Sequence, residues 1–309
     1  MKRVLLIAAV LCVAVSSFAL FRASDIVYVL AAANAPGAGG TQWQTDVWVT
    51  NPGLVDLKLT IEYLPTGAAG NPTPFDDSSR FHIDWPTTIA PRATLFIPNI
   101  VSVIKQTYPN VAVAGAFIFY GEQATGDILS LVVNSRTYTP KDPSDLSQGY
   151  FGQDIPGTPW FYYIDSNFAS SGLDAYWLVG LTDNTAFRTN VGIVNGSQGC
   201  ILDVKFELYD ATGTKVGEVT KTGIGALAQV QYAQMLINDF GLAAGVALDY
   251  SLRVSIAKST AVDSTHTCTP ALYTYASKVD NKTGDPNYVE ATYFMTSTAT
   301  DSVILCIWP

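Results

Sequence analysis

The sequence predicts an all-β protein made of two tandem antiparallel β-sandwiches, related by internal duplication and carrying short helical turns. Three observations predict this class. The stretch Thr41 to Asn51, TQWQTDVWVTN, recurs as Thr185 to Asn195, TAFRTNVGIVN. Each copy is followed by a stretch in which apolar and polar residues alternate with a period of two. Thr, Val, Tyr and Gly are plentiful while Lys and Glu are sparse, which favours sheet over helix.

The first elements follow directly from these patterns. Residues 26–32 are apolar and β-branched and predict the first strand, and the repeated stretch predicts the second. After the turn Asn51-Pro52-Gly53, the residues from Val55 to Tyr63 alternate between apolar and polar types, which predicts a strand with one face in water. In the second copy the residues from Leu202 to Leu208 repeat the pattern and end at the turn sequence Asp210 to Gly213.

The later elements also occur in pairs. A short strand at 93–97 matches one at 228–232, and a short helix at 99–105 matches one at 234–240. Strands at 114–120 and 128–138 match strands at 250–256 and 270–280, respectively. Asn99 is a suitable N-cap for the first helix, and Ser135-Arg136 aligns with Ser277-Lys278. About seven strands per copy, separated by Gly, Pro and Asn turns, fit an immunoglobulin-like sandwich.

The predicted domain organisation has four parts. They are a signal peptide at 1–19, a first sandwich at 25–140, a linker and inter-module join at 141–160, and a second sandwich at 161–309. The second sandwich carries extra C-terminal strands from Tyr288 onward, which have no counterpart in the first copy and are expected to pair with an open sheet edge.

The first residues predict the compartment. Lys2 and Arg3 precede an apolar run, and Ser17-Phe18-Ala19 offers the small residues that a signal peptidase reads. The run is too short to cross a membrane comfortably. We therefore expect a secreted or cell-surface protein without a transmembrane segment.

The formal net charge is −9, and removal of a signal peptide with Lys2 and Arg3 would make it more negative. Phosphate binding needs a basic face, so nucleic acid is not expected as a partner.

Three cysteines follow the signal peptide: Cys200, Cys268 and Cys306. An exported chain permits one disulfide. Cys200 lies in the inward phase of its strand and Cys268 in a loop, so we favour Cys200–Cys268, with Cys268–Cys306 as the alternative.

Several segments carry a family resemblance: TDVWVTNPG, NSRTYTP, GYFGQDIPG, FRTNVGIVN and YASKVDNKTGDP. They resemble segments of functionally uncharacterised exported bacterial proteins that are built of paired immunoglobulin-like β-sandwich modules. The resemblance covers nearly the whole mature chain. It implies the fold and the compartment, and it supplies no catalytic residues.

No catalytic or cofactor-binding residues are predicted. The only histidines are His82 and His266. The run Asp263 to His266 holds the residue types of a serine triad, but triads are assembled from separate segments. His82 and Asp84 share a strand face, yet two ligands are too few for a zinc site. We therefore expect a protein that is not an enzyme.

The loop from Asp280 to Asn287 is the one calcium candidate. Asp280 and Asp285 are its weak candidate ligands. The spacing differs from that of an EF-hand loop, and Asn, Gly, Asp and Pro are also ordinary turn residues. No other cofactor is expected.

The aromatic residues give the remaining predictions. Trp48 lies on the outward face of its strand and its counterpart is Gly192, so Trp48 marks a predicted partner-binding face. Tyr273 and Tyr275 align with Leu131 and Val133 and are expected in the core. The aromatic residues between Tyr150 and Tyr163 are expected to pack the modules together.

These observations predict a non-catalytic secreted or cell-surface protein with a structural or adhesive binding role. The alternatives are a carbohydrate-binding module and a subunit of an extracellular fibre or surface layer. The expected partner is a protein or polysaccharide at the cell surface, and self-association is a further expectation.

Overall fold

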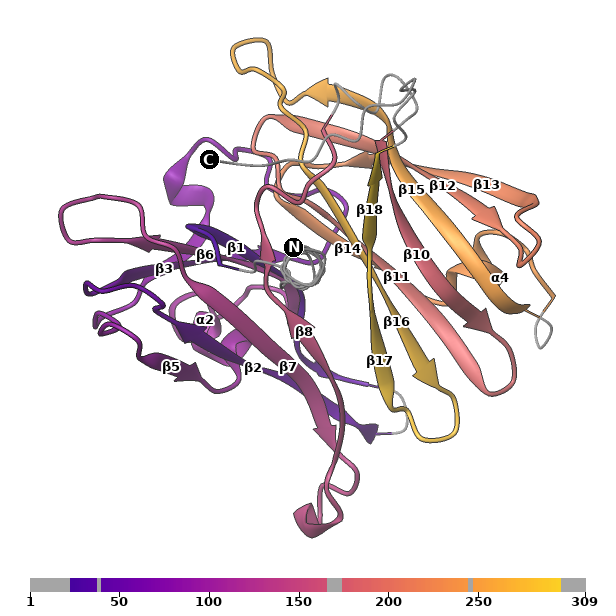
Figure 1. Cartoon of the computed structure of the whole chain (residues 1–309), viewed down its shortest axis with the longest axis horizontal. Helices are drawn as coiled ribbons and strands as arrows, with labels where there is room; N and C mark the ends of the chain where they lie inside the picture. Colours follow the sequence, from indigo (N-terminus) through magenta and orange to yellow (C-terminus); the bar gives the residue numbers. More distant parts are fainter. Residues whose placement is uncertain (1–22, 38–39, 166–173, 244–246, 296–309) are drawn as a thin grey trace, which may run out of the picture.

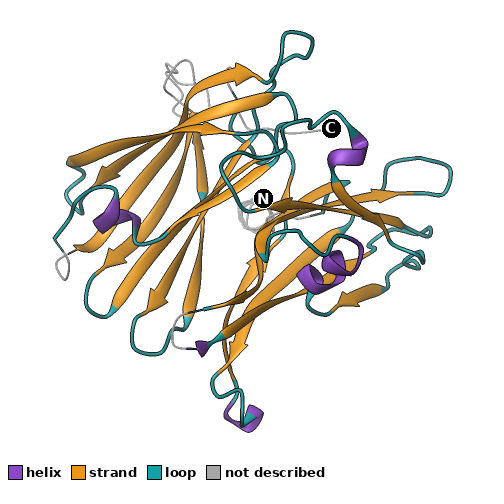
Figure 2. Cartoon of the chain, turned by 180° about the vertical axis from the view of Figure 1, so that it is seen from behind, coloured by secondary structure: helices purple, strands orange, loops and turns teal. Residues whose placement is uncertain are grey.

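The computed structural model describes residues 23–37, 40–165, 174–243 and 247–295. The predicted signal peptide and Cys306 lie outside these residues. The chain forms two β-rich halves that pack side by side, with the first half in indigo to magenta and the second in orange to yellow (Figure 1). Strands dominate and the helices are short (Figure 2). The prediction of an all-β antiparallel protein with short helical turns is confirmed.

The first half has two sheet layers that share the strand β1. One layer has the order β4-β3-β6-β1-β9, and the other consists of β5, β2, β7 and β8. β1 pairs with β6 over Ile26–Ala33 and with β2 over Asn34–Pro36, so it passes from one layer to the other. The strands are β1 Ile26–Pro36, β2 Gln42–Thr50, β3 Lys58–Pro65, β4 Phe81–Asp84, β5 Thr94–Ile97, β6 Ala114–Glu122, β7 Val132–Pro140, β8 Tyr150–Pro156 and β9 Thr158–Pro159.

The second half also has two layers, with the orders β13-β12-β15-β10-β18 and β14-β11-β16-β17. Its strands are β10 Asp174–Asp183, β11 Phe187–Asn195, β12 Cys200–Tyr209, β13 Lys215–Ile224, β14 Ala228–Tyr232, β15 Ala247–Ala261, β16 Leu272–Asp280, β17 Pro286–Glu290 and β18 Thr292–Met295. The helices in the described residues are α2 Ile100–Thr107 and α4 Met235–Asn238, with short 3₁₀ turns at Asp77–Ser79 and Leu146–Gln148.

The order of strand pairing in the first half recurs in the second. β2 lies between β5 and β7 as β11 lies between β14 and β16, and β6 lies between β3 and β1 as β15 lies between β12 and β10. Residues at the same position in the two pairing patterns are called counterparts below. β17 and β18 pair with β16 and β10 as β8 and β9 pair with β7 and β1. The expectation that the C-terminal strands have no counterpart is therefore wrong.

The stretch predicted as a linker, 141–160, contains β8 and β9. The turn-forming residues in it are confined to its first part, 141–149, where the 3₁₀ turn lies. From Tyr150 onward the chain pairs with β7 along seven residues. The Pro, Asp, Ser and Gly residues of the whole stretch predicted a linker, although its second part forms β8.

Each half encloses its own apolar core between its two layers. The apolar residues of β3 predicted to point inward are buried, but the expected water-exposed face of this strand is wrong, because Glu62 and Leu64 are buried as well. Val47 and Val49 of β2 are fully buried in the first core, and their counterparts Val191 and Ile193 of β11 are fully buried in the second. Full burial of such a side chain contributes about 1.5–3 kcal/mol. The repeated apolar residues therefore record two cores built to one pattern.

The repeated polar residues also have matching roles. Asn51 is fully buried, and its side-chain amide donates to the carbonyls of Val55 and Ile89 at 2.8 Å. Its counterpart Asn195 is also fully buried and donates to the carbonyls of Cys200, Ile224 and Gly225. Each Asn side-chain oxygen also accepts from the backbone N–H two residues later. A buried Asn thus satisfies the backbone of the turn that ends the strand.

Asp46 and its counterpart Asn190 hold the start of a helix. Asp46 Oδ1 accepts from the N–H of Asn99 at 2.9 Å, and Asn190 Oδ1 accepts from the N–H of Gln234 at 3.2 Å. Asn99 in turn caps α2, because its side chain accepts from Ser102 N. The predicted cap is confirmed.

A disulfide joins Cys200 and Cys268. Cys200 is fully buried at the start of β12, and Cys268 packs against the same core from the loop before β16. The bond closes a segment of 68 residues, and cross-linking stabilises a fold mainly by constraining the unfolded chain.

Candidate functional site

The two halves pack through a sheet face from each, and the edge strand β8 of the first half also contacts β17 of the second. The outer face of β14–β11–β16 in the second half lies against the outer face of β3–β6–β1 in the first. The buried side chains between them form a third apolar cluster, called the join here: Tyr28, Leu30, Leu64, Ala116, Ile118, Val194, Leu227, Tyr273 and Tyr275. The Tyr28 and Tyr273 rings lie 4.5 Å apart between centroids.

Tyr273 and Tyr275 belong to the join, so the expectation that they fill the core of the second sandwich is wrong. β7 pairs Val133 with Val49, whereas β16 pairs Thr274 with Ile193. Thr274 is therefore the counterpart of Val133, one residue away from the predicted alignment. A shift of one residue moves a side chain to the opposite face of a sheet.

Polar contacts fix the packing of the join. The Tyr273 hydroxyl donates to the carbonyl of Trp160 at 2.8 Å. The Tyr275 hydroxyl accepts from Gln229 Nε2 and donates to Gln231 Oε1, both at 3.0 Å. Burial raises the pKa of both phenols, so they remain neutral donors at ordinary pH.

Two loops meet backbone to backbone at one end of the join. The N–H of Gly67 donates to the carbonyl of Gln229 at 2.8 Å, and the N–H of Gly225 donates to the carbonyl of Ala68 at 2.7 Å. A Cβ at Gly225 would lie 2.0 Å from the carbonyl oxygen of Ala69. Glycine is required there because the two backbones approach so closely.

The aromatic residues between Tyr150 and Tyr163 enter the join only in part. Tyr163 packs against the cluster, and Trp160 donates from Nε1 to Asp25 at 3.0 Å. Tyr150 and Phe161 are instead exposed. Most of the join comes from the strands, so it could not be found from aromatic residues near the predicted boundary.

The outer face of β5–β2–β7 in the first half corresponds to the covered face of the second half, yet it lies outside the join. Its side chains are called the Trp48 face: Trp48, Thr50, Thr94, Phe96, Asn134 and Arg136. The rings of Trp48 and Phe96 stack with centroids 5.2 Å apart, and Phe96 is 47% exposed. Their counterparts are Gly192 and Gln231, and the counterpart of Asn134 is Tyr275.

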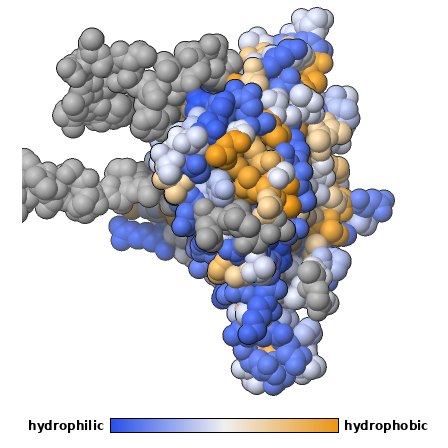
Figure 3. Space-filling model, turned by 90° about the vertical axis from the view of Figure 1, so that its right-hand side faces the viewer, coloured by the Kyte–Doolittle hydropathy of each residue, from blue (hydrophilic) through white to orange (hydrophobic). Residues whose placement is uncertain are grey.

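The second half has an outer face of its own, on the layer that does not contact the first half. Its side chains are called the Trp177 face: Trp177, Val179, Tyr209, Ser251 and Arg253. The Trp177 and Tyr209 rings lie 5.2 Å apart, and Val179 is 55% exposed. Figure 3 shows the side of the molecule formed by the second half, where apolar side chains gather in patches between polar ones.

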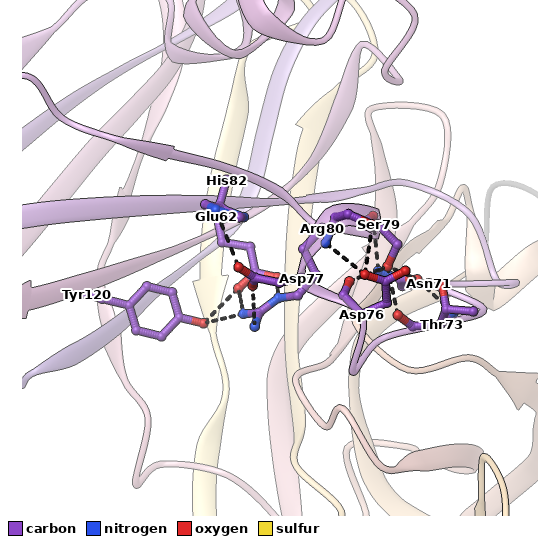
Figure 4. A network of polar contacts seen from close by, with 10 residues as sticks. Glu62, Asn71, Thr73, Asp76, Asp77, Ser79, Arg80, His82 and Tyr120 are labelled. Carbon is purple, nitrogen blue, oxygen red and sulfur yellow. Dashed lines mark hydrogen bonds and ion pairs between the residues drawn. The ribbon is translucent and has the colours of Figure 1, made fainter.

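A hydrogen-bonded charged cluster lies beside the join, around Glu62 on β3. Glu62 is 2% exposed, and its carboxylate accepts from Arg80 Nε at 2.7 Å, from Arg80 Nη2, and from the Tyr120 hydroxyl at 2.8 Å (Figure 4). Burial, and after it the charge of Glu62, raises the pKa of Tyr120. With both carboxylate oxygens engaged, Glu62 anchors Arg80 and its loop to the sheet.

Neither histidine joins a group with catalytic geometry. His82 Nε2 lies 4.0 Å from Asp77 Oδ2 at the edge of the Glu62 cluster (Figure 4). His266 Nδ1 lies 2.8 Å from Asp263 Oδ2, and its ring stacks on Phe75 of the first half at 3.5 Å. Hydrogen bonds from Thr265 and His266 lower the pKa of Asp263. The contacts place His266 between two loops of different halves.

The two calcium candidates bind the protein backbone. Asp280 Oδ1 accepts from the N–H groups of Lys282 and Thr283 at 2.8 Å, and these bonds lower its pKa. Asp285 Oδ1 accepts from the N–H of Gly152 on β8 at 3.0 Å. In the described part of the chain, no three His, Cys, Asp or Glu side chains gather as a metal site would require.

A crevice of about 340 Å³ opens between the halves next to the join. It is lined by alanines of β1, by Trp43 and Arg188, and by the amide side chains of Asn190, Gln229 and Gln231. Gln229 is 3% exposed, and its Oε1 has no hydrogen-bond partner within the described chain. An unpaired buried acceptor is unfavourable, and a hydroxyl donor would satisfy it.

No protein-family model matches the chain, and a search of curated proteins finds no match. Among the described residues, no helix has the length and apolar character needed to cross a membrane.

Proposed function

We propose that this chain is an exported, non-catalytic protein with a structural or adhesive role, built from two immunoglobulin-like sandwiches related by internal duplication. It binds a cell-surface partner through the Trp48 face. The matching roles of Asn51 and Asn195, and of Asp46 and Asn190, support the duplication, since such buried polar contacts are specific to one turn geometry.

The observation that carries the binding role is the Trp48–Phe96 stack on an uncovered sheet face. The corresponding face of the second half is buried in the join. A pair of stacked aromatic rings is rarely left on a flat surface without use, because aromatic residues dominate the energetics of interfaces.

Adhesion of protein-coated beads tests this function. Beads carrying the mature chain are mixed with bacterial cell envelopes, and the bound fraction is counted for the wild type and for Trp48→Ser with Phe96→Ser. We expect saturable adhesion that falls at least about tenfold in the variant, since loss of two interface aromatics removes more than about 1.4 kcal/mol.

The matched control is Leu54→Ser, at a side chain that is 76% exposed in the turn after β2. Equal loss of adhesion in this control, or unchanged adhesion in the Trp48 and Phe96 variant, would rule out the proposed face.

The crevice favours a second candidate function, the binding of a small neutral carbohydrate. Amide side chains, a tryptophan at the rim and the unpaired acceptor of Gln229 suit a ligand rich in hydroxyl groups. Calorimetric titration with a panel of soluble oligosaccharides tests it. Saturable binding that is weakened by Gln231→Ala supports this function. If no oligosaccharide of the panel binds, this function is ruled out.

A further inference from the structure

Each half has two outer sheet faces, and the join uses only one from each. The first half contributes the outer face of β3–β6–β1, and the second contributes the outer face of β14–β11–β16. The Trp48 face of the first half and the Trp177 face of the second lie outside this contact.

The Trp48 face corresponds in register to the face that the second half presents to the join. Trp48 pairs with Asn134 on β7 as Gly192 pairs with Tyr275 on β16. On the other side Trp48 pairs with Phe96 as Gly192 pairs with Gln231.

The Trp177 face corresponds in register to the face that the first half presents to the join. β1 pairs Tyr28 with Ile118, and β10 pairs Trp177 with Arg253. Leu64 pairs with Ala116 as Tyr209 pairs with Ser251. Trp177 and Tyr209 therefore stand where the first half has Tyr28 and Leu64 of the join. One face of each of the two kinds that pack together inside the molecule thus lies outside the contact between the described parts of the two halves.

The side chains of both uncovered faces suit an interface. The Trp48 face carries the stacked rings of Trp48 and Phe96, and the Trp177 face carries Trp177, Tyr209 and the exposed Val179. Arg253 on the latter donates to Glu207, so its charge is already paired. Tryptophan, tyrosine and arginine are the residues that contribute most to protein interfaces.

Resting on the proposed function, we infer that the partner of the Trp48 face is the Trp177 face of a second copy of this chain, so that the join is repeated between molecules. The contact joins two different surfaces, which makes it heterologous. In Figure 1, β5 and β2 lie at the lower left and β12 and β13 at the far right, so the two faces are at opposite ends of the molecule. Copies joined in this way add at either end and form linear chains.

Two variants separate the faces. Phe96→Ser with Trp48→Ser removes the aromatic pair of one face, and Val179→Asp places a charge on the other. Phe96 and Val179 are largely exposed, so the folded state is expected to persist, and thermal unfolding by circular dichroism checks it. Leu54→Ser is the control.

Sedimentation velocity on the mature chain gives the result. The average mass of the wild type and of the control rises with concentration, each face variant alone sediments as a monomer, and an equimolar mixture of the two variants forms pairs and no larger species. The mixture forms pairs because each variant retains one intact face. A monomeric wild type over the whole concentration range overturns the inference, as does a Val179→Asp variant that assembles like the wild type, because that result indicates contact between identical faces.

The outcome is distinguishable from failure of the proposed function. If the wild type is monomeric while its beads adhere to envelopes through Trp48, the self-association fails and the function stands. If the beads also show no adhesion that depends on Trp48, both fail.

Discussion

The outer face of β5–β2–β7 in the first half and the outer face of β14–β11–β16 in the second occupy the same place in their sandwiches. The first carries Trp48 and Phe96 and lies outside the join, whereas the second has Gly192 and Gln231 there and carries its aromatics, Tyr273 and Tyr275, on the neighbouring strand. A Cβ at Gly192 would lie 2.1 Å from the Tyr275 ring. A bulky residue on β11 would therefore displace the tyrosine that the join needs.

The comparison shows that two halves with the same order of strand pairing differ in the face that they place in the join. The inward residues of β2 and β11 stay apolar, as in Val47 and Val191, because each fills a close-packed core. Residues that point outward differ, and their differences accompany the difference in which face packs within the chain.

Tyr273→Ala is expected to have the largest effect on this comparison. The side chain is 1% exposed, its ring lies 4.5 Å from that of Tyr28, and its hydroxyl donates to the carbonyl of Trp160 across the join. Truncation of a large buried aromatic lowers the free energy of unfolding by about 3–5 kcal/mol. Urea denaturation followed by fluorescence measures it, and a loss below about 1 kcal/mol would mean that the join does not stabilise the fold.

Gly192→Ala is expected to destabilise the protein by about 1–3 kcal/mol, since the added methyl overlaps the Tyr275 ring. Gly217→Ala is the matched control, because its Cβ would meet only the Phe240 side chain, at 3.0 Å. Melting temperatures of the two variants give the comparison. Equal stability of both would show that Gly192 is not needed for close packing.

Glu207 is the counterpart of Glu62, and its ionisation makes the stability of the protein depend on pH. Burial opposes ionisation of Glu207, but the hydrogen bonds from Arg253 and Lys215, together with the charges of Arg253 and Lys205, outweigh it and lower the pKa of Glu207. A carboxyl whose pKa is lowered by folding stabilises the folded state at pH values above its ordinary pKa. This contribution is lost as the pH falls through the folded-state pKa. Glu207→Gln is therefore expected to be less stable than the wild type at pH 7 by about 1 kcal/mol, and the difference is expected to shrink below about pH 4. Denaturation at several pH values measures it, and a difference that is constant with pH would contradict it.

The smallest effect on stability is expected for the Trp48 face itself. Phe96→Ser changes a side chain that is 47% exposed and lies outside the cores. Surface substitutions of this kind alter the free energy of unfolding by about 0.5 kcal/mol or less. A loss comparable to that of Tyr273→Ala would mean that the Trp48–Phe96 stack serves the fold rather than a partner.

The sequence predicted the strands well because their signal is local. Alternation identified β3 and β12, and the cap at Asn99 identified α2. The disulfide was also the favoured pairing, since Cys200 has the inward phase of its strand.

The sequence did not predict the join, for a physical reason. Which outer face is covered depends on contacts between strands far apart in the chain, such as Tyr28 with Tyr273. An alignment error of one residue placed Tyr273 and Tyr275 inward, because phase in a strand has only two values. Thr274 points to the core because it pairs with Ile193 on β11. That strand register is supplied only by the structure.

Hydroxyl-radical footprinting at low and high protein concentration tests the central claim most directly, because it reads both equivalent faces in one experiment. The account predicts that Trp48 and Phe96 are oxidised in dilute protein and become protected as concentration rises, while Tyr273 and Tyr275 are protected throughout. Oxidation of Tyr273 and Tyr275 as fast as that of Trp48 in dilute folded protein, or no change at Trp48 with concentration, would contradict it.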